Sequence, residues 1–205
     1  MIVLILIFSF LLGSLPFGYW IVKWNTGQDI RELGSKNPGA TNEGRVLGRK
    51  FGVLILVLDA MKGALPPFLV AQFYQSENLI QIQLLCGTLS ILGHIFSPFL
   101  LFRGGKGVAT AFGFFLFMAT IPCLITTLIF VLGYKLSGFV SVGSVIGSIT
   151  LPITYFLLNR IHILEMKLDE ISILSTMVFA SIFILIRHIP NLKRLLTGQE
   201  LKAIE

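Results

Sequence analysis

Long apolar segments alternate with short polar ones along the whole chain. Most of the apolar segments are about 20 residues long, which is the length that a helix needs to cross the hydrocarbon core of a bilayer. The pattern predicts a polytopic, all-helical membrane protein. The expected spans lie near Ile2–Val22, Phe51–Tyr74, Leu79–Leu101, Val108–Ile121, Pro122–Lys135, Phe139–Leu158 and Ile171–Arg187.

The stretch from Val108 to Lys135 is too long for one comfortable crossing and too short for two full ones. Pro122 lies near its middle, where a proline would break a helix. We therefore expect two short helices, over residues 108–121 and 122–135, in place of a single span.

Composition agrees with a membrane protein. Apolar residues make up 55% of the chain and charged residues only 13%, whereas a soluble domain carries about 25% charged residues. Mean hydropathy is +0.87. Because no basic residue precedes the first apolar stretch, we expect a retained span there and not a signal peptide. Cys86 and Cys123 both fall in apolar segments, so we expect buried packing residues and not a disulfide or a metal-binding pair.

The positive charges predict the topology. Most basic residues lie in residues 23–50, in residues 103–106 with Lys135, and in residues 187–202. Cytoplasmic loops are enriched in such residues, and the three groups share one side only if residues 108–135 cross and return. This gives seven helices, with the N-terminus outside and the C-terminus cytoplasmic. The remaining loops hold Arg160 and Lys167 beside Glu77, Glu165, Asp169 and Glu170.

Two glycine-rich, basic segments stand out between the spans, residues 34–42 and residues 103–110. Glycines allow consecutive N–H groups to form a concave nest, and the start of a following helix adds partial positive charge. Both segments therefore have the composition of an anion site. In the first, Thr41 and Asn42 are the expected N-caps of the helix that follows. The alternative is a solvated loop that simply leads into a capped helix.

The second segment places Lys106 among Gly104, Gly105 and Gly107, and a lysine is a suitable point charge for phosphate. The alternative is an interfacial lysine beside flexible glycines. The spacing is not that of a Walker loop.

Other polar residues lie within or beside the spans. Asp59 and Lys62 share one helix face at a spacing of three, and they are either a functional pair or a structural ion pair. His94 is either a helix-packing donor or part of a pocket. Ser141 and Ser144 resemble ordinary small-residue helix contacts. A basic anchor at residues 187–194 explains the cations there, but it does not explain His188 and Asn191.

Several familiar chemistries have no matching pattern. No spacing of histidine, cysteine and acidic residues suggests a metal site, so we expect neither a metal nor an organic cofactor. The HxxxxD motif of many glycerolipid acyltransferases is absent at each of the three histidines, and no serine lies in a nucleophile elbow. Covalent catalysis therefore has little support.

Six motifs together resemble the bacterial acyl-phosphate:glycerol-3-phosphate acyltransferases of the PlsY type. They are GSLPFG (13–18), DIRELGSKNPGATN (29–42), LDAMKG (58–63), GH (93–94), GGKGVAT (104–110) and RHIPNLKR (187–194). The resemblance implies transfer of a fatty acyl group from acyl phosphate to the 1-hydroxyl of glycerol 3-phosphate. The products would be lysophosphatidic acid and phosphate. It also implies a seven-helix fold with the active site at the cytoplasmic face.

The resemblance further implies site residues. The family's phosphate-binding loop corresponds to Gly34, Ser35, Asn37, Gly39, Ala40, Thr41 and Asn42. The other residues that it marks are Arg45, which would hold glycerol 3-phosphate, Lys106 of the second loop, Ser141, and the pair His188 and Asn191. Gly138 is a departure, because the family often has a basic residue there, and this weakens the assignment of Ser141.

These observations predict one membrane acyltransferase domain over residues 1–205, in the bacterial inner membrane. Its expected partners are acyl phosphate, glycerol 3-phosphate, membrane lipids and the enzyme that supplies acyl phosphate. We expect a non-covalent mechanism in which a substrate phosphate accepts the hydroxyl proton. The alternatives are a transporter for a phosphate-bearing anion and a non-catalytic lipid-binding protein, although we find no internal repeat of the transporter kind. Anionic lipids and substrates explain the sequence pI of 9.6 without nucleic acid.

Overall fold

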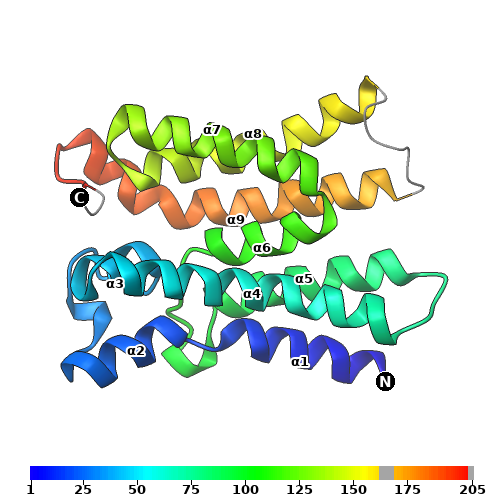
Figure 1. The fold of residues 1–205 in the computed structure, drawn as a ribbon, viewed down its shortest axis with the longest axis horizontal. Coiled ribbons are helices and arrows are strands. Elements are labelled where there is room, and N and C mark those ends of the chain that lie inside the picture. Colours follow the sequence, from blue (N-terminus) through cyan, green and yellow to red (C-terminus); the bar gives the residue numbers. More distant parts are fainter. Residues whose placement is uncertain (162–168, 203–205) are drawn as a thin grey trace.

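The computed structural model describes residues 1–161 and 169–202, and within these residues the chain is helical. Figure 1 shows the arrangement of the elements. The α-helices are α1 (Ile2–Ser14), α2 (Phe17–Thr26), α3 (Ala40–Leu47), α4 (Arg49–Phe73), α5 (Leu79–Ile95), α6 (Val108–Met118), α7 (Thr120–Ser137), α8 (Val140–Arg160) and α9 (Glu170–Leu196). Two short 3₁₀-helices cover Ile30–Glu32 and Pro98–Leu100. Glu165 and Lys167, which we expect in the loop before α9, lie outside the described residues.

Among the described residues, six apolar segments are long enough to cross a membrane, when α1 and α2 are counted as one segment, and α6 is a shorter apolar helix. The prediction of an all-helical fold is confirmed, with six to seven apolar helices in the described part of the chain where we expected seven spans. Cys86 and Cys123 are buried free thiols, as expected.

The first expected span, Ile2–Val22, is divided into two helices. Leu15 is extended, with φ −59° and ψ 118°, between α1 and α2. The residue before a proline is pushed out of the helical region, and Pro16 itself has no N–H to donate. The carbonyl oxygen of Leu15 instead accepts a hydrogen bond of 3.0 Å from Nζ of Lys62, so a partner on another helix compensates for the break.

We expected Pro122 to separate two short helices, but the break between the helices lies three residues earlier. The chain turns at Ala119, with φ −149° and ψ 68°, and Pro122 lies in the first turn of α7. A proline is tolerated there because the first N–H groups of a helix have no intrahelical partner. As a result α7 is 18 residues long, and only α6 is short, with 11 residues.

The last helix also differs from the prediction. We expected it to end at Arg187, but α9 continues to Leu196 with Pro190 inside it. His188 and Asn191 therefore lie on a helix and are both buried. A rigid helix, and not a loop, holds these two side chains inside the molecule.

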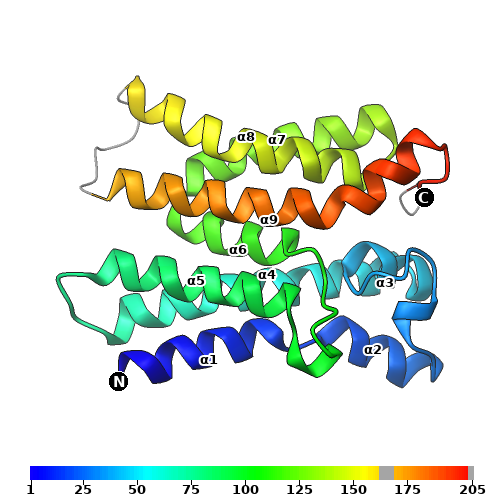
Figure 2. The ribbon, with the colours of Figure 1, turned by 180° about the vertical axis from the view of Figure 1, so that it is seen from behind.

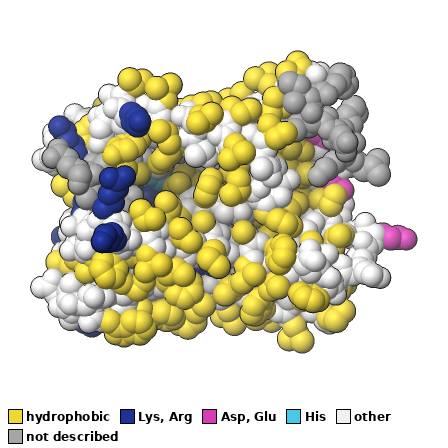
Figure 3. Space-filling view, viewed as in Figure 1, with side chains coloured by type: hydrophobic (Ala, Val, Ile, Leu, Met, Phe, Trp, Pro, Cys, Tyr) yellow, Lys and Arg dark blue, Asp and Glu magenta, His cyan; other side chains and the backbone are white. Residues whose placement is uncertain are grey.

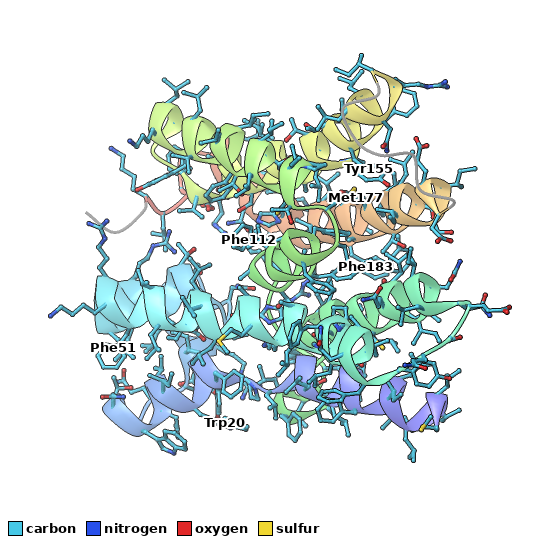
Figure 4. The ribbon with its side chains drawn as sticks, turned by 45° about the vertical axis from the view of Figure 1, so that its right-hand side comes forward. Trp20, Phe51, Phe112, Tyr155, Met177 and Phe183 are labelled. Atoms are coloured by element: carbon cyan, nitrogen blue, oxygen red, sulfur yellow. The ribbon has the colours of Figure 1, made fainter. Side chains whose placement is uncertain are left out.

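Helix α6 lies between two groups of helices (Figures 1 and 2). It packs closely on α4, while α7 packs on α8 and α8 on α9. Glycines permit the close contact with α4: a side chain at Gly63 would overlap the backbone of Thr110, and one at Gly113 would overlap Ala60. Small residues at such crossings are typical of membrane helices. Figure 4 labels Phe112 of α6 and Phe183 of α9, which are partly buried and pack against the hydrophobic core.

Candidate active site

A polar cavity of about 130 Å³ lies at the end of the molecule that carries α3 and the C-terminal segment. It joins the loop before α3, the start of α6, the start of α8 and the last turns of α9. Nearly all the residues that the sequence analysis singled out for the site line it. They are Ser35, Asn37, Gly39, Ala40, Thr41, Asn42, Arg45, Asp59, His94, Lys106, Gly107, Ser141, Ser144, His188 and Asn191.

Asn42 holds the first loop in shape. Its Oδ1 accepts a hydrogen bond of 2.8 Å from the amide of Ser35, and its Nδ2 donates one of 3.0 Å to the carbonyl of Leu33. Between them Gly34 has φ +53°, and a side chain there would overlap Oδ1 of Asn42. Gly34 therefore shapes the loop from behind the cavity.

The prediction that Thr41 and Asn42 cap the next helix is wrong. Helix α3 begins at Ala40, after Gly39, so both residues lie in its first turn. The side chain of Asn42 reaches back to the loop before the helix and not to the amides that follow it. As first-turn residues, Ala40 and Thr41 have amide groups without intrahelical acceptors, and both line the cavity.

Lys106 supplies a cation at the opposite wall. Its Nζ donates a hydrogen bond of 2.6 Å to Oδ1 of Asn191, which lies 85 residues later in the chain. Burial, opposed by Glu200 and assisted by the nearby Arg194 and Arg45, lowers the pKa of Lys106 to about 8. An arriving phosphate would favour the protonated form again.

Gly104 and Gly105 lie behind Lys106. Their amides donate to the carbonyls of Ile95 and His94 at 3.0 and 3.1 Å, and their own carbonyls accept hydrogen bonds from Arg187. Neither glycine lines the polar cavity. We expected these two glycines to contact phosphate directly. The geometry does not favour this contact, because their amides already donate to other carbonyls. Gly107 does line the cavity, with φ +84°.

The C-terminal segment completes the site through Glu200, which the sequence analysis missed. One carboxylate oxygen, Oε1, accepts hydrogen bonds from Ser141 at 3.0 Å and from Asn191 at 2.6 Å. The other, Oε2, accepts one of 2.8 Å from Nε of Arg194. The only sequence signal was a lone acidic residue in a basic segment. Glu200 therefore fixes the positions of Ser141 and Asn191 relative to each other.

Arg45 is bound to the same segment. Its guanidinium donates hydrogen bonds of 2.9 to 3.0 Å to the carbonyls of Leu201 and Lys202. Burial lowers the pKa of Arg45, although Glu200 opposes this shift. Arg45 stays charged, since an arginine remains protonated in proteins.

His188 has a defined orientation on α9. Its Nδ1 lies 2.7 Å from the carbonyl oxygen of Ile184. A carbonyl only accepts, so Nδ1 carries a proton, and in a neutral imidazole Nε2 is then an acceptor.

The predicted pair of Asp59 and Lys62 is confirmed, with 2.9 Å between Oδ1 and Nζ and both side chains buried. Nδ1 of His94 lies 3.7 Å from the same Oδ1. Asp59 and His94 line the polar cavity, whereas Lys62 does not and instead binds the carbonyl of Leu15. Lys62 thus joins α4 to the break between α1 and α2.

Behind this pair, Glu43 of α3 is 2% exposed, and it too was missed. Its carboxyl group lies against Gly18, where a side chain would overlap it. Burial, together with the neighbouring Asp59, raises the pKa of Glu43 to about 8. Within the described residues, Oε2 of Glu43 has no hydrogen-bond partner. Glu43 is therefore a buried, largely neutral acid under the first loop.

An apolar cavity of about 220 Å³ adjoins the polar one. Leu56, Val108, Ala109, Phe130 and Ser144 line both. The apolar cavity continues between α6, α7 and α8 as far as Cys123 and Leu151. A cationic cavity and an apolar cavity are therefore continuous, which suits a molecule with a phosphate at one end and an acyl chain at the other.

Residues 3–198 match the family model described as glycerol-3-phosphate acyltransferase. A glycerol-3-phosphate acyltransferase of Leptospira borgpetersenii serovar Hardjo-bovis is 48% identical over 199 residues, covering 96% of this chain and 89% of that protein. One of Fusobacterium nucleatum is 38% identical, covering 96% and 95%.

A solved structure is also similar. The crystal structure of PlsY (YgiH), an integral membrane glycerol 3-phosphate acyltransferase in its glycerol 3-phosphate form, superposes with a TM-score of 0.84. The two sequences are 33% identical, and the match covers 98% of this chain and 94% of the other.

Proposed function

Since the chain belongs to the glycerol-3-phosphate acyltransferase family, we propose that its acyl donor is acyl phosphate and its acceptor the 1-hydroxyl of glycerol 3-phosphate. The products are lysophosphatidic acid and inorganic phosphate. The observation that carries this proposal is the continuity of the two cavities. Lys106 and Arg45 line the polar one, and Leu56 and Phe130 line both.

Lys106 and Arg45 neutralise phosphate, and the amides of Ala40 and Thr41 are placed to donate to an oxyanion. Well-oriented pairing of two reactants contributes roughly 7–11 kcal/mol to lowering a barrier. An oxyanion donor adds about 2.7–4 kcal/mol. Both effects favour a site that binds two anions side by side.

The chemical step needs no covalent intermediate. The hydroxyl oxygen of glycerol 3-phosphate bonds to the acyl carbon, the bond from that carbon to the phosphate oxygen breaks, and the hydroxyl proton passes to the departing phosphate. The two carboxylates at the cavity already have partners, Asp59 in its ion pair with Lys62 and Glu200 with three donors. A substrate phosphate is therefore the better proton acceptor. Nε2 of His188 is left to accept a hydrogen bond that orients the glycerol hydroxyl.

The proposal extends to topology. The N-terminus lies outside and the C-terminus in the cytoplasm of a bacterial inner membrane, with the whole chain acting as one domain. The Lys and Arg side chains seen in Figure 3 gather at the end of the molecule that carries α3 and the C-terminus, which suits a cytoplasmic face. The enzyme that supplies acyl phosphate is then a partner on this side. Family membership leaves no reason to retain the transporter alternative.

The direct experiment supplies purified protein with glycerol 3-phosphate and palmitoyl phosphate, and follows phosphate release and lysophosphatidic acid. Palmitoyl-CoA and a palmitoylated carrier protein are offered separately as donors. We expect product with palmitoyl phosphate alone. Equal or faster turnover with either thioester would overturn the proposed donor. A Lys106→Ala variant that retained full activity would overturn the assigned phosphate site.

A further inference from the structure

A groove of about 750 Å³ runs along the surface between α4 and α7 and meets the polar cavity. Helix α4 packs on α3, α5 and α6, whereas α7 packs on α8 and α6. The two walls of the groove therefore belong to different groups of helices. Leu56 of α4 and Phe130 of α7 line the groove, the polar cavity and the apolar cavity at once. The three spaces meet between these two side chains.

The lining of the groove combines positive charge with apolar surface. Arg49, Lys135 and Lys202 line it, and its described lining includes no acidic residue. Its apolar lining includes Val53, which is 52% exposed, and Leu56. This combination matches an amphiphile with an anionic head, because the head is attracted by the cations while its hydrocarbon stays in contact with apolar side chains.

We propose that this groove is the lateral portal through which the acyl phosphate donor passes from the bilayer to the site. The inference rests on the proposed function and adds the route to it. A long acyl chain is unfavourable in water, and a route between α4 and α7 never removes it from apolar contact. The cations hold the phosphate near the membrane surface until it reaches Lys106.

Two side chains form the junction. Phe130 lies against Gly143 and Gly147 of α8, with ring carbon Cδ2 close to the space that a side chain at either glycine would fill. Leu56 opposes it from α4 and is 44% exposed. The head enters the polar cavity while the chain slides between Leu56 and Phe130 into the apolar cavity. The same opening lets the lysophosphatidic acid product leave.

Blocking the groove tests the route. Val53→Trp fills it, and the matched control is Leu54→Trp, at the next position on α4, which is 46% exposed and lines none of the three spaces as described. We expect Val53→Trp to raise KM for palmitoyl phosphate severalfold while KM for glycerol 3-phosphate stays unchanged. Leu54→Trp should change neither. Equal donor KM values in the two active variants would overturn the portal.

Removing the charges tests it independently and leaves the helix packing intact. A triple variant with Arg49→Gln, Lys135→Gln and Lys202→Gln is compared with Lys193→Gln, an exposed cytoplasmic-end lysine away from the groove. Near a membrane surface we expect about a fivefold rise in donor KM for each cation removed at low ionic strength, and a smaller rise in high salt.

The assay is run in vesicles of phosphatidylcholine, with and without phosphatidylglycerol. A triple variant that changes only the response to phosphatidylglycerol, with donor KM unchanged, would make the groove a phospholipid site and overturn the portal. If the wild type turns over palmitoyl-CoA and not palmitoyl phosphate, the proposed donor itself is wrong, and so is a portal for it. If the wild type is active on palmitoyl phosphate and both sets of variants have the same donor KM as the wild type, the portal is refuted and the proposed donor is not.

Discussion

Lys106 combines two properties that a phosphate-binding cation needs, a fixed position and a tunable charge. Asn191 fixes its ammonium group at 2.6 Å, while burial lowers its pKa to about 8. Without substrate, Lys106 therefore loses its proton only slightly above neutral pH.

We expect kcat/KM for glycerol 3-phosphate to fall as pH rises through about 8, because the free enzyme then loses the Lys106 proton. Lys106→Arg should be slower but lack this fall, since a guanidinium stays charged. Lys106→Met should lose about 10²–10³-fold, comparable with the loss of an oxyanion donor, and Lys193→Met should lose nothing. The measurement is the pH profile of kcat/KM. It is repeated with Glu43→Gln, because the carboxyl group of Glu43 also has a pKa of about 8 and its titration must be excluded. An unchanged profile in Lys106→Arg would contradict the assignment.

Glu43 gives a prediction for stability and not for chemistry. Its pKa is raised from 4.5 to about 8 in the folded protein, so between these values the folded state binds more protons than the unfolded state. Stability must then decrease as pH rises through this window, by at most about 1.4 kcal/mol per pH unit from this group. Glu43→Gln keeps the shape without titrating. Its Tm should fall less than that of the wild type between pH 5 and 8, whereas parallel Tm curves would show that Glu43 is ionised in the fold.

At the scale of helices, the contact between α4 and α6 depends on a glycine of each helix, Gly63 of α4 and Gly113 of α6. A side chain at Gly113 would overlap the backbone of Ala60, which cannot move without shifting the whole of α4. By contrast, a side chain at Gly133 of α7 would meet the flexible end of Ile146 at 3.0 Å.

Gly113→Ala should therefore destabilise the protein by about 1–3 kcal/mol through overpacking. Gly133→Ala serves as the control, because its strain is small and alanine favours a helix by up to about 1 kcal/mol. Thermal unfolding in detergent, read by far-ultraviolet circular dichroism, gives both values. Equal Tm values for the two variants would contradict the close packing of α4 on α6.

The spans themselves were predictable, since length and apolar content are local properties of the sequence. The effects of the prolines were not. Pro16 separates two helices, Pro122 lies in a first turn, and Pro190 lies inside α9. Which outcome occurs depends on partners from elsewhere in the chain, such as Lys62 for the carbonyl of Leu15. Sequence alone does not show such partners.

At the scale of the whole molecule, the two glycine-rich motifs indicated the site because their composition is local. The contacts that complete the site at its C-terminal side were missed, because they join residues that are far apart in the sequence. Glu200 reaches Ser141 across 59 residues, and Arg45 binds carbonyl groups more than 150 residues away. The amide contacts of Gly104 and Gly105 likewise depend on where α5 ends. Three-dimensional packing determines these relations, and no motif records them.

The size of the apolar cavity predicts chain-length selection. Along α8 it extends from Ser144 to Leu151, which is about 10 Å at 1.5 Å per residue. An extended chain advances roughly 1.2 Å per bond, so about eight carbons fit. A palmitoyl chain must therefore continue past Leu151, so Leu151→Phe should shift preference from palmitoyl towards octanoyl phosphate by about tenfold in the ratio of kcat/KM values.

The control for this measurement is Ile153→Phe, on the same helix but 50% exposed. Leu151→Ala should shift the ratio in the opposite direction. If Leu151→Phe and Ile153→Phe gave the same ratio of kcat/KM values, the acyl chain would not lie in this cavity.

The hydrogen bond between Lys106 and Asn191 also has a meaning for biogenesis. The two residues are separated by 85 positions, so at a synthesis rate of about 5–20 residues per second the second follows the first by about 4–17 seconds. During that interval the early helices can enter the bilayer while the contact between Lys106 and Asn191 does not yet exist. With the proposed site as the catalytic centre, a nascent chain cannot consume its acyl donor until the last helix has been inserted.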